Sequence, residues 1–191
     1  MSLKDDALII KNETESGANT ATRIGLLLER LSNSSGWASY ADGTYTEGSP
    51  LELAIDTDTL LPNDATTTIE TQKPYDITEY YDGSTIIGKN GDSAVITIDF
   101  LAKPTSGTTT YIEIWLDITG GTGTPTNLAN LYKRIISFPK GNGIERPIVL
   151  STLVYSLDTW DANGAVVKVR ANGTCDIYDI RYVISRTHKA V

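Results

Sequence analysis

Apolar and polar residues alternate along most of the chain after Trp37, which is the pattern of strands that bury one face. In segment 94–102 (AVITIDFLA), Ile96, Ile98 and Phe100 share one face. Segment 111–118 (YIEIWLDI) alternates in the same way, so we predict two half-buried antiparallel strands whose aliphatic faces contact one core. Its two predicted faces are Ile112, Ile114, Leu116 and Ile118, and Tyr111, Glu113, Trp115 and Asp117.

Further strands are expected at 147–155 (PIVLSTLVY), at 164–171 (GAVVKVRA) and at 176–186 (DIYDIRYVISR). Many reversals between strands are expected, because Asx-Gly dipeptides accept the backbone of tight turns. Eight or so strands with no helices between them predict an all-β fold, an antiparallel jelly-roll-type β-sandwich. In the last strand, Tyr178, Ile180, Tyr182 and Ile184 are expected on one face, and the turn dipeptides are Asp42-Gly43, Asp82-Gly83, Asn90-Gly91, Asn142-Gly143, Asn163-Gly164 and Asn172-Gly173.

One short N-terminal α-helix is predicted in front of the sandwich, within residues 15–34 (ESGANTATRIGLLLERLSNS). Asn19 or Thr20 can cap it, and four aliphatic residues then recur with helical spacing on one face. A helix of about 13 residues is marginal alone, so this stripe must dock on something. We divide the chain into an attachment segment, 1–35, and a sandwich domain, 36–191. The expected contact residues are Ile24, Leu27, Leu28 and Leu31 of the stripe, with Ala21 and Gly25 allowing close approach of another backbone.

Composition narrows the class of protein. Apolar residues make up 40% of the chain and charged residues 21%, as in an ordinary globular protein. The formal net charge of −8 disfavours a nucleic acid partner, which requires clustered cations. No apolar stretch has the length of a membrane span or a secretion signal, so we expect no membrane partner and synthesis in a cytoplasm. A lone Cys175 cannot form an internal disulfide.

The sequence contains few candidates for catalytic, metal-binding or ligand-binding residues. His188, the only histidine, lies near the C-terminus, and Cys175 fits a small buried residue better than a nucleophile. We predict no cofactor, no metal and no catalytic residue, although paired carboxylates of a glycosidase are invisible in sequence. Two acidic groups fit either a cation site or structural turns, and the aromatic residues fit either a sugar-stacking surface or the core. These residues are Asp56, Asp58 and Asp64; Asp158, Asp161 and Asn163; and Trp37, Tyr40, Tyr45, Tyr75, Tyr80, Tyr81, Trp115 and Trp160.

Residues 117–130 (DITGGTGTPTNLAN) are rich in Gly and Thr and are expected to form a long exposed loop. The segment has almost no apolar residue to anchor it. It is therefore a candidate recognition loop at the tip of the domain.

The segment 17–25 (GANTATRIG) resembles a short N-terminal segment of tail-fibre, head-fibre and other virion-surface proteins of tailed bacteriophages. The C-terminal 177–191 (IYDIRYVISRTHKAV) is similar to the end of jelly-roll domains in such proteins, and 73–118 resembles the same class. The resemblance implies a virion-surface location, assembly in a bacterial cytoplasm, frequent homotrimers and no catalytic residues.

We therefore interpret the chain as a non-enzymatic virion structural protein: a trimeric head-fibre, tail-fibre or capsid-decoration subunit, with the helix contacting other copies or other virion proteins. The alternative for the helix is that it folds back onto its own sandwich. The alternative function is a host receptor-binding or carbohydrate-binding module that contacts a surface glycan or receptor, followed by a glycan-active enzyme.

Overall fold

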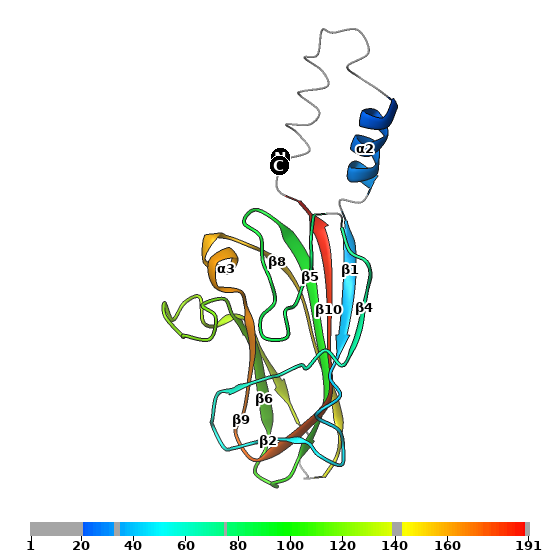
Figure 1. The fold of residues 1–191 in the computed structure, drawn as a ribbon. Helices are drawn as coiled ribbons and strands as arrows, with labels where there is room; N and C mark the ends of the chain where they lie inside the picture. The colour runs from blue at the N-terminus through cyan, green and yellow to red at the C-terminus, as the bar shows by residue number, and fades with distance from the viewer. Residues whose placement is uncertain (1–20, 33–34, 75, 139–142, 190–191) are drawn as a thin grey trace.

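The structure is a computed structural model that describes residues 21–32, 35–74, 76–138 and 143–189. These ranges form an all-β sandwich with one helix in front of it and a short second helix near its end (Figure 1). The elements are α2 (Ala21–Ser32), β1 (Gly36–Ala41), β2 (Leu51–Leu53), β3 (Thr59–Leu60), β4 (Thr67–Gln72), β5 (Ser93–Pro104), β6 (Tyr111–Asp117), β7 (Leu131–Ser137), β8 (Arg146–Tyr155), α3 (Asp158–Asn163), β9 (Val166–Ala171) and β10 (Cys175–His188).

Two antiparallel sheets form the sandwich. The large sheet has the order β4-β1-β10-β5-β8, with β2 added on β10, and the small sheet has the order β3-β9-β6-β7. The first long strand pairs with the last one, and the chain crosses repeatedly between the sheets, as in a jelly roll. The predicted fold class is therefore confirmed.

The core between the sheets contains the aliphatic faces that the sequence pattern predicted. Ile96 and Ile98 of β5 and Ile112 and Ile114 of β6 belong to one buried cluster. Phe100 and Leu116 lie in the same cluster, so the predicted common core is confirmed.

Strand β6 departs from the prediction because it is buried on both faces. Trp115 and Asp117 lie on its outer face but are 1% and 0% exposed. Long side chains of the neighbouring strands cover them: the ammonium of Lys133 lies 4.6 Å from the centre of the Trp115 ring, and Lys168 pairs with Asp117 at 2.8 Å. Alkyl stems of lysine commonly cover apolar surface in this way.

Strand β10 contains a bulge that changes which side chains share a face. Its register with β5 shifts between Tyr178 and Arg181, and Asp179 has a φ of 54°. Ile177 therefore lies in the core, and Ile180, Tyr182 and Ile184 return to it. Tyr178 lies outside this cluster, and its hydroxyl donates to Glu145, so its predicted place beside the other three was wrong.

The short helix α3 was not predicted from the sequence, where its residues appeared as a turn or cation cluster. Trp160 is its one buried residue, and the amide of Gly164 closes its C-terminus on the carbonyl of Trp160. Gly164 has a φ of 73°. The dipeptide Asn163-Gly164 thus ends a helix, a common use of glycine, instead of forming a hairpin turn.

The connection between β6 and β7 is exposed in its middle, as predicted, but both of its ends are anchored. Thr119 is buried and its amide bonds to Asp117, while Ala129 is buried and Leu128 packs against the core. The expectation that this loop lacks apolar anchors was therefore wrong at its C-terminal end.

Candidate functional site

Helix α2 stands beyond one end of the sandwich, where it leads into β1 (Figure 1). None of its described side chains belongs to the hydrophobic core. Ile24 and Leu28 of the predicted stripe are exposed and Leu27 is half-buried, and a Cβ placed on Gly25 would meet nothing within 4 Å. For Ala21 and Leu31 the structure describes the helical backbone and not the side chains. Folding of the helix back onto its own sandwich is thus not what the structure shows.

The outer face of the large sheet carries further exposed apolar side chains along its two sides. Trp37 is 39% exposed and Ile69 47% at one side, while Leu153 is 61% exposed and Val149 46% at the other. Small residues of β1, β10 and β5 lie between them. The three rows of facing residues are Gln72, Trp37, Ser185, Val95 and Leu153; Ile69, Ser39, Val183, Thr97 and Ser151; and Thr67, Ala41, Arg181, Asp99 and Val149.

The three rows are almost free of charge, although Asp176, Lys103 and Glu52 lie further along the same face. Arg181 and Asp99 are the charged side chains in those three rows, and they pair with each other at 3.0 Å. The chain as a whole contains 24 acidic and 16 basic residues. On such a chain, three adjacent rows whose only two charges pair with each other are a distinct feature.

The outer face of the small sheet, in contrast, carries several paired charges. Glu113 of β6 pairs with Lys133 at 2.9 Å and with Arg170 at 2.8 Å. Burial opposes the ionisation of Asp117, but bonds from Lys168 and Thr119 hold its pKa below the ordinary value. These buried carboxylates of the outer face already have cationic partners, and they form a charged ladder across the sheet.

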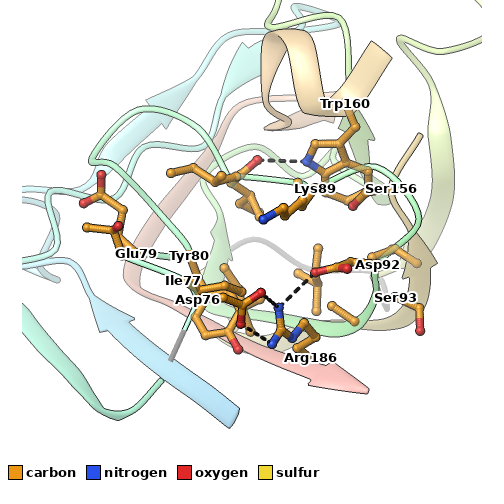
Figure 2. Close-up of a pocket in the computed structure, with 18 residues that line it drawn as sticks. Asp76, Ile77, Glu79, Tyr80, Lys89, Asp92, Ser93, Ser156, Trp160 and Arg186 are labelled. Atoms are coloured by element: carbon orange, nitrogen blue, oxygen red, sulfur yellow. Dashed lines mark hydrogen bonds and ion pairs between the residues drawn. The ribbon is translucent and has the colours of Figure 1, made fainter. Parts of the chain in front are cut away.

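A pocket of about 240 Å³ lies at the end of the sandwich where β5 begins and β10 ends (Figure 2). It opens between the strap, residues 76–92, and the ends of β5, β8, β10 and α3. Trp160 of α3 donates its indole N–H to the carbonyl of Ile86 at 2.9 Å, which fixes the strap to the helix. Gly88 lies against that indole, since an added Cβ would stand 2.3 Å from Trp160 Cδ1.

Arg186 forms the floor of this pocket (Figure 2). Its side chain is 1% exposed and pairs with Asp76 at 2.6 Å and with Asp92 at 3.1 Å. Lys189 also pairs with Asp76, at 2.9 Å. Burial raises the pKa of Asp76, but the bonds from Arg186 and Lys189 outweigh it and lower that pKa to about 2. This cluster joins the strap to β10.

Sequence reasoning missed this cluster, although a signal for it exists. Arg186 continues the inward alternation of Ile180, Tyr182 and Ile184, so the pattern placed a cation at a buried position. A buried arginine requires carboxylate partners. The sequence offers many carboxylates and does not show which of them lies nearby.

The acidic residues that were candidates for a cation site instead form hydrogen bonds with nearby protein groups, several of them in turns. Asp64 accepts from the amides of Gly43 and Thr66 and from the Thr44 hydroxyl, and these bonds hold its pKa well below the ordinary range. Among the described residues, no cluster of three or more metal-ligating side chains occurs. Asp58 faces Arg170, Asp158 and Asp161 bond Asn90, Asn163 bonds the carbonyl of Thr159, and Asp56 has a φ of 50° in its turn.

Most of the aromatic residues fill the core instead of forming a sugar-binding surface. Tyr40, Tyr81 and Tyr182 pack edge to face with ring centres 5.4 Å apart. Tyr80, Trp115 and Trp160 are also buried, Trp37 is exposed, Tyr45 is half-buried, and Tyr75 lies outside the described residues.

The two side chains considered for nucleophilic chemistry lie in the core and at the end of the last strand. Cys175 is buried, and burial raises the pKa of its thiol to about 12. His188 is exposed at the end of β10. No described helix is long and apolar enough to span a membrane.

Comparison with known proteins gives similarity of structure without similarity of sequence. No family model matches the chain, and no curated protein sequence matches it. Similar solved structures include the PRD1 vertex protein P5, with 13% identity, a TM-score of 0.43, and coverage of 81% of this chain and 73% of that chain. The Eiger TNF from S. frugiperda has 10% identity and a TM-score of 0.48 over 82% of this chain and 96% of that chain. The globular domain of zebrafish complement 1qA protein has 7% identity and a TM-score of 0.39 over 81% and 99%. With TM-scores under 0.5, these likenesses carry no argument about function.

Proposed function

We propose that this chain is a non-enzymatic structural protein of a bacteriophage particle, a homotrimeric fibre or decoration subunit. Its copies associate through helix α2 and the outer face of the large sheet. The observation that carries the proposal is the set of three almost uncharged rows on the outer face of that sheet, on a chain with a net charge of −8.

A second copy of the chain fits this face better than a charged partner does. Large exposed apolar patches mark interaction sites. Two acidic copies repel each other least where the surfaces that meet carry no unpaired carboxylate, and in these three rows the one carboxylate, that of Asp99, pairs with Arg181. A nucleic acid or a basic protein would find no unpaired charge on these three rows to recognise.

The helix offers a further exposed apolar surface. Trp37 lies near the start of β1, at the end of the large sheet beyond which α2 stands, so the sheet face begins close to the helix (Figure 1). The exposed Ile24 and Leu28 can then meet their counterparts from other copies on a common axis. The assignment to a virion is supported by the resemblance of segments 17–25 and 177–191 to phage surface proteins.

The non-enzymatic part of the proposal is supported by the carboxylates. Glu113, Asp117, Asp76 and Asp92 each contact a cationic side chain at 3.1 Å or less. Such pairing suits a structural role better than general acid and base work, which needs a carboxyl group facing substrate.

Electron microscopy of purified particles that carry an epitope-tagged copy tests the proposal. The label should lie on the particle surface at positions of threefold symmetry, and a tagged chain without residues 1–35 should be absent from particles. Absence of the full-length tagged chain from purified particles would contradict the proposed role.

The receptor-binding alternative rests on the exposed middle of the β6–β7 connection, 120–127. Shortening this loop should leave folding, incorporation and host adsorption intact if the protein is a structural subunit. Loss of adsorption with normal incorporation would favour receptor binding.

A further inference from the structure

Strand β8 is an open edge of the large sheet. It pairs with β5 on one side, and in the described part of the chain no strand pairs with its other side. Soluble proteins protect such edges with charges or bulges, because a row of unpaired amides and carbonyls is a template for another strand. The edge strands β4 and β7 carry Glu70, Lys133 and Arg134. By contrast, no residue from Pro147 to Leu157 is charged, and the pairing of β8 with β5 has no bulge.

The backbone groups that face this open edge follow from the hydrogen bonds just beyond the end of β8. The amide of Ser156 donates to the carbonyl of Asp92 at 2.9 Å, and its carbonyl accepts from the amide of Gly91 at 2.8 Å, so both groups point toward the β5 side. In an antiparallel ladder the direction of these groups alternates from one residue to the next. The even-numbered residues of β8 therefore bond to β5, and the odd-numbered residues direct their backbone groups to the open edge.

Two of the outward positions have no amide to offer another strand. Pro147 lacks an amide hydrogen. At the other end, burial raises the pKa of the Tyr132 hydroxyl, and a hydrogen bond from the backbone amide of Tyr155 opposes that rise, so this amide already has a partner. Among the described residues, the three outward positions between them have no backbone partner, and the middle one is Ser151.

An antiparallel copy of the same strand matches this arrangement. A two-fold axis at Ser151 places this residue opposite its own counterpart, and Val149 opposite the partner's Leu153. The same axis places Pro147 opposite the partner's Tyr155, so the two positions without an available amide face each other. Residues directly opposite in an antiparallel pair share a face, so the exposed Val149 and Leu153 would also cover each other.

We propose that two copies of this chain join their large sheets edge to edge, with β8 antiparallel to β8 of the partner subunit and a two-fold axis at Ser151. Three pairs of facing residues then exchange two backbone hydrogen bonds each. A second copy fits better than a charged peptide, because chains with a net charge of −8 repel each other least where a segment without charge meets its own counterpart.

This contact is small and goes beyond the proposed threefold contact. It consists of one strand edge and a single row of side chains, and interfaces under about 1,200 Å² are typical of transient encounters. We therefore expect it at the high local concentration of a particle surface and not in dilute solution. It can join copies from two different trimers.

Cysteine cross-linking of the full chain at millimolar concentration tests the position of the axis. In a hydrogen-bonded antiparallel pair the Cα atoms lie about 5.5 Å apart, which a disulfide can span. With oxidised glutathione, Ser151→Cys should form a linked dimer of about 41 kDa, twice the 20.7 kDa of one chain. Leu153→Cys is the matched control, because its two copies would lie about 13 Å apart along the strands and should not cross-link. The native Cys175 is buried.

A mixture of two variants tests the register independently. Val149→Cys and Leu153→Cys chains should form a linked dimer when they are mixed, because these positions face each other across the proposed axis. Neither variant should form one alone.

Two results would overturn the proposal. The first is that neither folded Ser151→Cys nor the mixture gives a linked dimer on a non-reducing gel. The second is that Ser151→Cys and Leu153→Cys cross-link at equal rates, which would indicate random collision. Melting curves before oxidation establish that each variant is folded. Failure of the cross-link would leave the threefold mass and the labelling of particles unchanged, so it is distinguishable from failure of the proposed structural role.

Discussion

Replacing Arg186 with methionine removes the cation that holds the strap to the sandwich. The side chain of Arg186 is 1% exposed, and those of Asp76 and Asp92 are 11% and 9% exposed. Removing one partner of a buried ion cluster leaves the other charges uncompensated, at a cost of about 3–5 kcal/mol. We expect Arg186→Met to lower the free energy of unfolding at pH 7 by that amount.

The pH dependence gives a sharper test than the size of the loss. The pKa of Asp76 is lowered from 3.8 to about 2, and a shift of this size corresponds to about 2 kcal/mol of stability. This contribution is fully present above pH 3.8 and is lost as the pH falls toward 2, where the folded protein binds the proton. The variant lacks most of it, so the difference in stability between wild type and variant should shrink between pH 4 and pH 2.

Urea unfolding followed by circular dichroism, at one fixed protein concentration, measures both effects. Arg134→Met removes the same charge from an exposed position on β7 and should change stability by less than about 0.5 kcal/mol. A loss under about 1 kcal/mol for Arg186→Met at pH 7, or a loss that stays constant into acid, would refute the reasoning.

Three further variants or probes test the packing. Ile114→Asp places an unpaired charge at a position that is 0% exposed and should unfold the domain; unchanged melting would mean that the faces of β6 are assigned wrongly. Gly88→Ala brings a Cβ to 2.3 Å from the Trp160 ring and should destabilise the fold by about 1–3 kcal/mol in urea titrations, whereas wild-type stability would show that the ring moves freely. Burial raises the pKa of Cys175 to about 12, so iodoacetamide at pH 8 should label the thiol in urea and not in the folded protein; rapid native labelling would contradict this placement.

Alternation was a sufficient guide to several of the longer strands. Strands β5, β8, β9 and β10 bury one face each, so their aliphatic residues recur at every second position. Strands β1, β4 and β7 were not identified; β7 has no fully buried residue, so its sequence shows no buried face. Strands β2 and β3 contain 3 and 2 residues, too few for any periodicity.

The other features that the sequence did not predict arise from contacts between segments far apart in the chain. The outer face of β6 looks solvent-facing in sequence because Glu113 and Asp117 are acidic, and only the structure brings Lys133, Lys168 and Arg170 over it. The pocket depends on a strap and a helix that meet through Trp160 and Ile86, which are 74 residues apart. Local sequence patterns do not show which distant residues come into contact.

The mass of the full chain in solution tests the central claim most directly. Sedimentation equilibrium at micromolar concentration should give about 62 kDa, three times the 20.7 kDa of one chain. Leu153→Lys on the outer face of the large sheet should lower this mass, as should removal of residues 1–35, while Leu60→Lys, which charges an equally exposed position on the small sheet, should not. A wild-type mass of one chain, or a trimer that Leu153→Lys and the truncation leave intact, would contradict the account.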